Sequence, residues 1–313
     1  MLLFVAKRLA LAVPTLLAVL TLVFFLVRIV PGDPALVVLG DQASPDALRQ
    51  MRERLGLDRP LIQQYAEYLA GIATGDLGRS LTTNRPVLAD VLAVLPYTIE
   101  LTLAALAIGI AFGVPLGVMA ALKRNGAADW IARIVSLVGL SFPAFVSGVL
   151  LLIVFAIQFR WFPVISAPKS GDLADRLRAL ALPAINLGVI MIAYVTRVTR
   201  SGMLTALGED YVRTARAKGV PGRVVVWRHA LRNVLIPIVT IIGLNLGVLI
   251  GNSVLTEIVF SRPGLGKIIV NALNTRDYAT LQGMMIVFAF AIVIANVATD
   301  LVYGLVDPRV KAT

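Results

Sequence analysis

Cysteine is absent from this 313-residue sequence, and histidine occurs only once. The absence of cysteine excludes disulfides, thiolate metal sites and cysteine nucleophiles, so we expect no metal and no cofactor chemistry in this chain. Charged residues are also scarce, at 15%, whereas a soluble domain carries about 25%. Hydrophobic residues make up 58% of the chain. This composition predicts an integral membrane protein.

The sequence also lacks a phosphate-binding loop. Gly264-Leu265-Gly266-Lys267 does not have the GxxxxGK[ST] spacing and does not follow a soluble strand. No pair of aspartates in an apolar segment offers a protease dyad, and no group of side chains forms a catalytic constellation. The chain is therefore predicted to be no enzyme and to bind no nucleotide itself, so any ATPase that drives it must be a separate subunit.

Long apolar segments are what the sequence has in abundance. Each is long enough to cross about 30 Å of hydrocarbon as a helix, and Pro143 is expected to kink the third. Together they predict an all-α membrane protein with six transmembrane helices. The segments are Leu9–Val27, Thr98–Leu122, Ile134–Ile157, Leu180–Thr196, Leu235–Val254 and Leu281–Val306.

Basic residues gather in alternate loops and set the predicted orientation. Residues 197–233 hold eight Lys/Arg against Glu209 and Asp210, whereas residues 31–95 hold six Lys/Arg against eight Asp/Glu. Residues 160–179 are discordant, with four basic residues against two Asp. The positive-inside rule still places both termini and the basic loops in the cytoplasm. The net charge of +11 is therefore attributed to loops on the membrane surface, and not to nucleic-acid binding.

Three regions follow from this topology. Residues 1–30 form the N-terminus and first span, residues 31–95 form an extracytoplasmic insertion, and residues 96–313 form a core with a cytoplasmic loop at 197–234. Within the insertion, Leu48–Leu55 and Leu61–Ile72 are predicted as short amphipathic helices. By itself the insertion is as compatible with a purely structural cap over the helices as with a functional role.

The basic loop between Asp210 and Pro237 is predicted to fold as two helices. Asp210 is placed to cap a short helix up to Lys218, and Gly219 can adopt the left-handed conformation that ends it. Pro221 suits the first turn of a second helix, which is expected to run from about Gly222 to Asn233. Two functions remain open at this point. The loop either contacts a partner, or its arginines only hold the positive side inside and contact anionic lipid.

Few polar side chains lie within the apolar segments. Asn245 and Asn252 are seven residues apart and share one face of the fifth span. That face either lines a pathway or joins helices by hydrogen bonds. With Ser141 and Pro143 they are the candidate translocation-path residues. Glu100 and Asp300 lie near helix ends, where a salt bridge or snorkelling is expected.

The short helix and its glycine resemble the coupling loop of ABC importer permeases, known as the EAA loop. Counted back from Gly219, the family's Glu position holds Arg213, so the generic Glu is absent. Its two Ala positions hold Thr214 and Ala215. The form found here is similar to that of the dipeptide, oligopeptide and nickel branch. Ile236-Pro237 resembles the distal hydrophobic-Pro pattern of the same coupling loop. Other landmarks that match this branch are Pro31-Gly-Asp-Pro34, Gly75-Asp-Leu-Gly-Arg-Ser80, Trp227-Arg-His-Ala-Leu-Arg-Asn233, Thr256-Glu257, Pro263-Gly-Leu-Gly266 and Asp307-Pro-Arg309.

The resemblance covers essentially the whole chain, and the long loop after the first span is similar to that of the first of the two permeases in such systems. It implies a type I ABC importer permease in a bacterial inner membrane. Its partners would be a second permease, two ATPase subunits that hold ATP and Mg, and an extracytoplasmic solute-binding protein. The residues implied in coupling to the ATPase are Tyr211, Arg213, Thr214, Ala215, Arg216, Ala217, Lys218, Gly219 and Pro237.

The substrate class implied by the resemblance is di- or oligopeptides. Similar permeases serve nickel chelates, glutathione and some sugars, and nothing in the spans decides among these. A secondary transporter or channel, which needs no ATPase, is the alternative from another class. It would require clustered carboxylates in the spans as a coupling-ion site, and the sequence offers none.

Overall fold

The computed structural model describes residues 2–29, 33–40, 43–168 and 172–306. Within these ranges the chain is helical, and its only β-type pairing is an isolated bridge between Arg79 and Pro86. Pro31, Gly32 and the motif at 307–309 lie outside the described residues. In chain order, the elements are α1 (Leu2–Ile29), α2 (Pro34–Leu39), α3 (Pro45–Arg54), α4 (Leu61–Thr74), α5 (Val87–Leu122), α6 (Ala127–Ser141), α7 (Ala144–Leu151), the π-helix η1 (Leu152–Gln158), α8 (Leu173–Ala206), α9 (Asp210–Ala217), α10 (Gly222–Val224), the π-helix η2 (Val225–Ala230), α11 (Leu231–Val259), α12 (Leu265–Asn274) and α13 (Tyr278–Val306).

In the part of the chain that the structure describes, five helical segments are long and apolar enough to cross a membrane: α1, α5, α8, the continuous run from α10 to α11, and α13. A sixth is obtained if α6 and the α7–η1 run count as one span, because these two are bent by 106° at a short break. The break falls at Phe142 and Pro143, where proline cannot continue the helical hydrogen bonding. The predicted all-α membrane architecture is confirmed, and so is the kink at Pro143.

Several helices extend beyond the predicted spans. α8 begins inside the predicted outer loop and ends inside the predicted basic loop, and α5 begins at Val87 within the predicted insertion. Val87 and Val91 in the first turns of α5 are buried, as are Met203 and Ala206 in the last turns of α8. Tertiary packing, which hydropathy does not detect, stabilises these extensions. α2 has no counterpart among the predicted helices.

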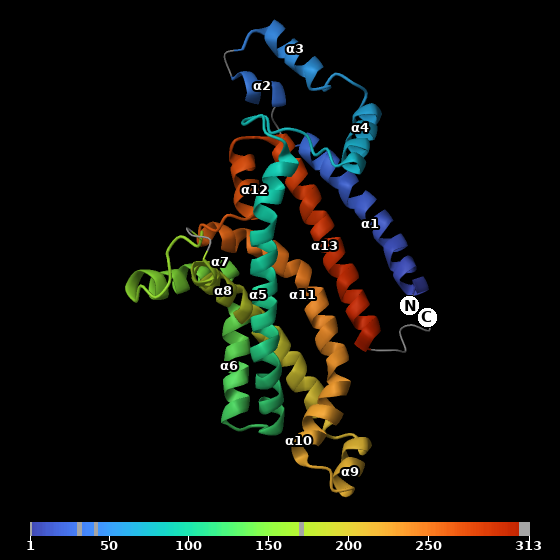
Figure 1. The fold of residues 1–313 in the computed structure, drawn as a ribbon, viewed down its shortest axis with the longest axis vertical. Helices are drawn as coiled ribbons and strands as arrows, with labels where there is room; N and C mark the ends of the chain where they lie inside the picture. The colour runs from blue at the N-terminus through green and yellow to red at the C-terminus, as the bar shows by residue number, and fades with distance from the viewer. Residues whose placement is uncertain (1, 30–32, 41–42, 169–171, 307–313) are drawn as a thin grey trace. The chain divides into compact units, whose positions relative to one another are not determined.

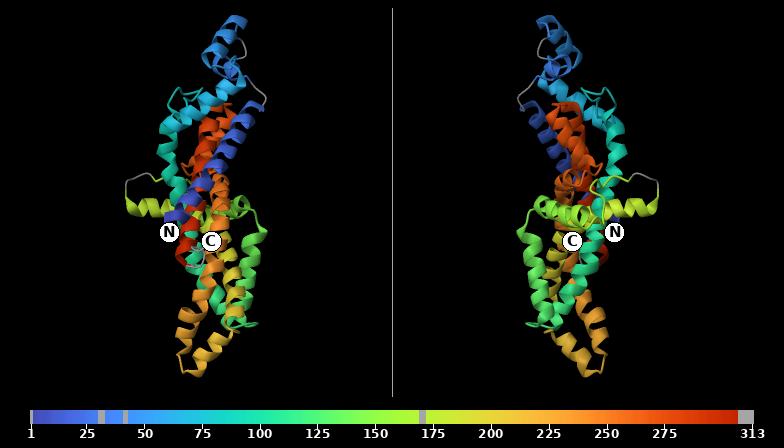
Figure 2. Two further views of the ribbon diagram at one scale, coloured as in Figure 1. Left: turned by 90° about the vertical axis from the view of Figure 1, so that its right-hand side faces the viewer. Right: turned by 90° about the vertical axis from the view of Figure 1, so that its left-hand side faces the viewer.

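The chain divides into two compact units, each with its own core. Unit 1 comprises Met1–Leu9, Ile99–Arg262 and Ile294–Thr313, and unit 2 comprises Ala10–Thr98 and Pro263–Val293. In unit 1, α8 packs against α6, α7 and α11. The segment between α8 and α11, which contains α9 and α10, lies at one end of these helices (Figures 1 and 2).

Three glycines on α5 form a seam with α8 in unit 1. Gly109, Gly113 and Gly117 follow one another at four-residue spacing and face Met191, Val195 and Thr199 on α8. A Cβ added at Gly113 would lie 2.8 Å from the Val195 Cβ, and one added at Gly117 would lie 2.6 Å from the Thr199 Cβ. Only glycine permits this approach of the two backbones, which is a common way of packing membrane helices. We call these contacts the glycine seam.

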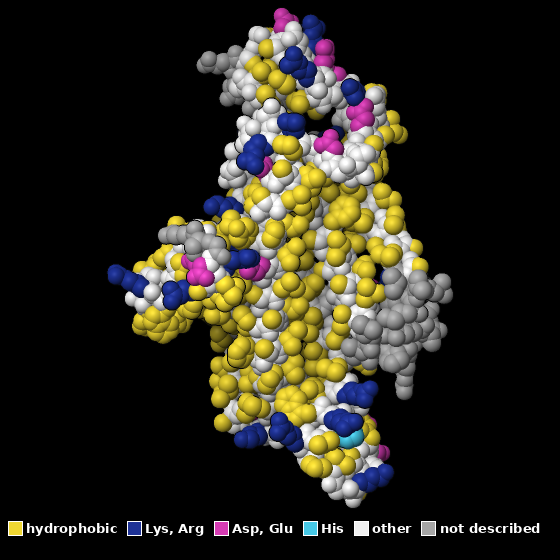
Figure 3. All heavy atoms as spheres, viewed as in Figure 1, with side chains coloured by type: hydrophobic (Ala, Val, Ile, Leu, Met, Phe, Trp, Pro, Cys, Tyr) yellow, Lys and Arg dark blue, Asp and Glu magenta, His cyan; other side chains and the backbone are white. Residues whose placement is uncertain are grey.

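The surface of unit 1 separates by side-chain type. Hydrophobic side chains cover the visible faces of α5 and α6, whereas Lys and Arg gather at the end that carries α9, α10 and the α5–α6 turn (Figure 3). That turn contributes Lys123 and Arg124, both exposed. An apolar belt with basic residues at one end is the pattern expected of a multi-pass membrane protein.

In unit 2, α4 packs on the end of α1 through aromatic rings. Phe24 is fully buried, with its ring centroid 5.1 Å from that of Tyr65 and 5.4 Å from that of Tyr68. Arg28 lies over the Phe24 ring and donates to the Gln64 Oε1. The two helices that were expected in the insertion are present as α3 and α4. The Arg28 side chain is bound by groups of the protein.

A buried carboxylate fastens the loop between α4 and α5 to the start of α13 in unit 2. The Asp277 Oδ2 accepts from the Ser80 Oγ at 2.5 Å and from the Thr280 Oγ1 at 2.9 Å. The Asp277 Oδ1 accepts from the backbone N–H of Leu81 and of Thr280, each at 3.1 Å. Burial raises the pKa of this carboxyl, but the hydrogen bonds from Ser80, Leu81 and Thr280 outweigh it and lower the pKa from its ordinary value.

Replacing Gly113 by valine is expected to force α5 and α8 apart. Overpacking of this kind costs about 1–3 kcal/mol, so the thermal midpoint of the purified chain in detergent should fall. Gly251→Ala on α11 is the control, because a Cβ there meets no atom within 4 Å. Equal midpoints for Gly113→Val and the parent chain would show that the seam has room for side chains.

Asp277→Asn is expected to destabilise the chain by about 1–3 kcal/mol at pH 7, because one of the two acceptor oxygens becomes an amide NH2 that faces buried donors. Since the folded-state pKa is lowered, the carboxylate stabilises above its ordinary pKa of about 3.9, and this stabilisation is lost as the pH falls through the folded-state pKa. The gap in thermal midpoint between variant and parent should therefore close on acidification. The exposed Asp46→Asn should show no such gap, and a gap at Asp277 that does not change with pH would contradict the assignment.

Candidate coupling and translocation sites

The segment between α8 and α11 folds as two short helices around a glycine, as predicted. α9 is followed by Gly219 at φ +73°, in the left-handed region, and Pro221 precedes α10. Two details differ from the prediction. Glu209 and not Asp210 is the N-cap residue of α9, without a side-chain capping bond. The second helix also does not stop near Asn233, since α10, η2 and α11 form one continuous helical run.

α9 has one buried face and one exposed face. Val212 is fully buried and Ala215 is 9% exposed, and both belong to the core of unit 1 together with Val226 of η2. The predicted coupling residue Ala215 thus packs inside this chain. The remaining predicted coupling residues of the segment are exposed, namely Tyr211, Arg213, Thr214, Arg216, Ala217, Lys218 and Gly219.

The exposed face of α9 is basic and largely uncompensated. Arg213 is 3.5 Å from Asp210, but both side chains are mostly exposed, so solvent screens this pair. Arg216 and Lys218 have no ion pair among the described residues. Pro237, the last predicted coupling residue, is exposed within α11, and so it lies on a different helix from this face. The geometry offers a small, rigidly mounted basic surface.

The candidate path residues are not gathered at one place. The buried Asn245 donates to the backbone carbonyl of Ile241 on its own helix at 2.8 Å, so this bond joins no second helix. Asn252 is half-buried on the same helix. Ser141 and Pro143 flank the break between α6 and α7. Of the four, only Ser141 lines the groove described next.

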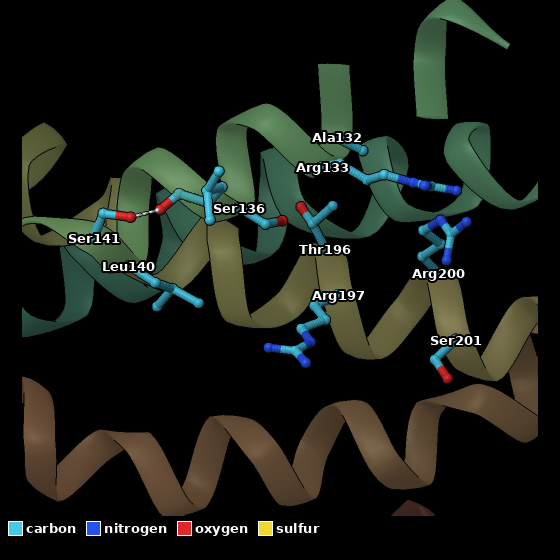
Figure 4. Close-up of a pocket in the computed structure, with 10 residues that line it drawn as sticks. Ala132, Arg133, Ser136, Leu140, Ser141, Thr196, Arg197, Arg200 and Ser201 are labelled. Atoms are coloured by element: carbon cyan, nitrogen blue, oxygen red, sulfur yellow. Dashed lines mark hydrogen bonds between the residues drawn. The ribbon is translucent and has the colours of Figure 1, made fainter. Parts of the chain in front are cut away.

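A groove of about 580 Å³ runs between α6 and α8 in unit 1. Figure 4 shows Arg133 and Arg200 at one end, Leu140 and Ser141 at the other, and Arg197 between them. Its lining combines cationic, hydroxyl and aliphatic groups, so it suits a small polar solute better than a lipid chain. The lining residues are Ala132, Arg133, Ser136, Leu137, Leu140, Ser141, Thr196, Arg197, Arg200 and Ser201.

A buried aspartate closes the basic end of this groove. Asp129, in the first turn of α6, is fully buried and accepts from the Arg200 Nη2 and the Arg133 Nη2, each at 2.9 Å. It also accepts from the backbone N–H of Asn125, which has a φ of +61° in the α5–α6 turn. We call this arrangement the Asp129 clamp. It joins α6 to α8 and fixes the turn before α6.

Salt bridges account for the acidic residues near helix ends, as expected. The Glu100 carboxylate lies 2.7 Å from the fully buried Arg262 and 3.3 Å from Arg176. Asp300 lies 3.0 Å from Arg8. Among the described residues no group of three or more His, Cys, Asp or Glu side chains is placed to hold a metal ion.

Neither the Asp129 clamp nor the groove was predicted from the sequence. The four-residue spacing of Asp129 and Arg133 was a readable signal for a pair on one helix face. The contact with Arg200, 71 positions away, had no such signal. The GxxxGxxxG spacing from Gly109 to Gly117 was likewise readable as a helix-packing motif.

Two family models match the chain. Residues 113–312 match the model described as "Binding-protein-dependent transport system inner membrane component", and residues 1–102 match the corresponding N-terminal model. A similar solved structure is a chain of the MetNI methionine ABC transporter in an inward-facing conformation, with a TM-score of 0.56. It covers 70% of this chain and 96% of that chain at 18% identity, so the likeness concerns the fold alone.

Full-length relatives are considerably closer in sequence. The di/tripeptide transport system permease protein DppB of Pseudomonas aeruginosa is 42% identical, with 99% of each chain covered. The dipeptide transport system permease protein DppB of Escherichia coli K12 is 39% identical, again with 99% of each chain covered. The glutathione transport system permease protein GsiC of Pectobacterium atrosepticum is also 39% identical, over 97% of each chain.

Replacing Asp129 by alanine should lower the thermal midpoint of the chain in detergent by roughly 5 °C or more. The substitution removes a fully buried carboxylate and leaves the largely buried Arg200 without its partner. The matched control is Asp210→Ala on α9, which removes an exposed carboxylate that is also paired with an arginine on its own helix. We expect no measurable change for the control. Similar midpoints for Asp129→Ala and Asp210→Ala would contradict the role of the clamp.

Proposed function

The chain belongs to the family of binding-protein-dependent transport system inner membrane components, and on this premise we propose that it forms half of the translocation pathway of an ATP-driven importer for di- and oligopeptides. The observation that carries the substrate class is the full-length similarity to permeases named for dipeptides and di/tripeptides. In this proposal the chain moves peptides without an ATPase site of its own.

Glutathione is a second candidate substrate. A permease named for glutathione transport is 39% identical to this chain over nearly its full length, which is close to the identity with the dipeptide permeases. Glutathione is itself a peptide with free carboxylates, so both candidates share one chemistry. A direct comparison of uptake decides between them.

The proposed partners are a second, similar permease, two ATPase subunits and an extracytoplasmic solute-binding protein. The end of unit 1 with α9 and the α5–α6 turn would face the cytoplasm, since Lys and Arg gather there. Residues 31–95 would then lie outside, where the solute-binding protein arrives. Both termini would be cytoplasmic in this orientation.

The exposed face of α9 is the proposed docking surface for an ATPase subunit. Arg213, Arg216 and Lys218 can bind carboxylates or backbone carbonyls of the partner through charge-assisted hydrogen bonds. Val212 and Ala215 hold α9 against η2 by packing in the core. A movement of the ATPase surface would therefore be transmitted to α8 and α11, the two long helices that flank this segment.

The uptake assay uses the complex reconstituted in vesicles with its binding protein and ATP. We expect saturable uptake of a labelled dipeptide, competed by unlabelled dipeptide more strongly than by glutathione. If glutathione were the better competitor, the second candidate would replace the first. ATP-independent uptake that follows an ion gradient would instead favour a secondary transporter.

Arg216→Glu should reduce both uptake and co-purification of the ATPase by about tenfold or more, because one charge-assisted bond to a partner is typically worth about 1.5–3 kcal/mol and repulsion replaces it. Arg178→Glu on α8 is the control, as Arg178 is exposed and has no ion pair among the described residues. Membrane insertion should be normal for both. Undiminished co-purification and uptake with Arg216→Glu would remove the coupling proposal.

A further inference from the structure

The groove between α6 and α8 carries more positive charge than its own acidic partner neutralises. Three arginines line it, and Arg133 and Arg200 both bind the Asp129 carboxylate. Arg197 forms no ion pair with any of the described residues. One guanidinium therefore faces the groove with its charge uncompensated.

Arg197 lies within an apolar helix and not in a surface loop. It is nine residues from the end of α8, which corresponds to about 13 Å along the helix axis. Arg200, one turn nearer to that end, is the residue tied into the Asp129 clamp. An ionisable side chain in a membrane-spanning segment is costly, and it typically marks a substrate or ion pathway.

The remaining lining suits a short peptide. α6 lines the groove with the aliphatic side chains of Leu137 and Leu140 and with the hydroxyl groups of Ser136 and Ser141, which donate to the backbone carbonyls of Ala193 and Leu137 and keep their acceptor positions. From Ala132 to Ser141 the lining follows α6 for about 14 Å, a length that accepts an extended di- or tripeptide. A guanidinium binds a carboxylate through two parallel hydrogen bonds, which an ammonium group of lysine does not reproduce.

We propose that the groove between α6 and α8 is a subsite of the translocation pathway, in which Arg197 binds the terminal carboxylate of the transported peptide. This inference rests on the proposed peptide-import function. Of the path residues predicted from the sequence, only Ser141 lines this groove. The proposal adds Arg197 as the residue that binds the substrate and the terminal carboxylate as the group that it binds. The Asp129 clamp holds the other two arginines, so that Arg197 is the groove arginine without a carboxylate partner among the described residues.

An anionic lipid headgroup offers similar chemistry through its phosphate. The basic residues Lys123 and Arg124 of the α5–α6 turn are exposed and mark the end where headgroups are expected. The Asp129 clamp holds Arg200 beside that turn, and Arg197 lies one helical turn further from it. Arg197 is more than two helical turns from the end of α8. The experiment separates the two occupants.

The absence of natural cysteine makes a single introduced thiol specific in this chain. Ser201→Cys places the thiol in the groove one turn from Arg197 on the same helix face. Thr205→Cys places a control thiol one turn further along, about 12 Å from position 197 along the axis and outside the groove lining. Both are prepared in the full complex in lipid nanodiscs, and modification is read from the intact mass of this chain.

Two methanethiosulfonates of opposite charge probe the local field. The anionic ethylsulfonate reagent should react faster than the cationic trimethylammonium reagent with the thiol of Ser201→Cys, by about fivefold relative to the control thiol. Adding Arg197→Gln should abolish this preference. An unchanged preference in that double variant would show that Arg197 does not set the field of the groove, and would overturn the proposal.

Protection then identifies the ligand. Alanyl-alanine should slow modification of the groove thiol in Ser201→Cys, whereas alanyl-alanine amide, which lacks the carboxylate, should not. Equal protection by both peptides, or by neither, would overturn the assignment. Slower modification on replacing phosphatidylcholine by phosphatidylglycerol, without protection by dipeptide, would assign the groove to lipid phosphate instead.

Uptake distinguishes a failure of this subsite from a failure of the proposed function. Arg197→Gln should lower dipeptide uptake about tenfold while ATP hydrolysis stimulated by the binding protein is retained, and Arg197→Lys should recover part of the uptake. Arg178→Gln on the same helix is the control. If the parent complex imports no peptide, the proposed function fails. If the parent complex imports peptide and the Arg197→Gln complex imports it at the same rate, the proposed function stands and only the assignment of the subsite is wrong.

Discussion

The close contact between α5 and α8 is the constraint on which the rest of unit 1 depends. The glycine seam removes side-chain volume at Gly113 and Gly117, so that the two backbones meet directly. In lipid, helices gain little from hydrophobic burial, and such close packing supplies much of their association. The seam fixes α8, and α8 in turn carries Arg197 and Arg200 in its last third and leads into α9 at its end. A rigid α8 therefore links the proposed substrate subsite to the proposed docking surface.

Polar contacts fasten the ends of the helices where apolar packing cannot specify a register. In unit 1, the Asp129 clamp joins the start of α6 to α8, and the Glu100–Arg262 bridge joins α5 to the segment after α11. In unit 2, Asp277 performs the same task for the loop before α5. Each carboxylate accepts several hydrogen bonds, which is the condition for burying a charge without a large loss of stability.

Composition and local spacing were sufficient to predict the helical membrane class, the kink at Pro143, and the two helices around Gly219. They were not sufficient for the helix ends, because the extension of α5 to Val87 is stabilised by contacts with residues far along the chain. The same limit applies to the candidate site. Exposure separates Arg216 from Ala215 on α9, and only the fold shows which face is buried. Arg197 looked like one of eight basic loop residues, and its place inside α8 became visible only with the structure.

Arg197 and Arg200 show how the same side chain serves two purposes on one helix. Arg200 is bound on both sides of its guanidinium fork by a buried carboxylate, so it contributes to structure and is not available to a solute. Arg197 lies one turn away, lines the same groove, and has no such partner among the described residues. The Arg197 side chain is exposed, and no ion pair within the described chain neutralises its charge. A transient anionic solute would neutralise that charge only while it is bound, and this is the behaviour required of a pathway residue, which must bind its substrate and then release it.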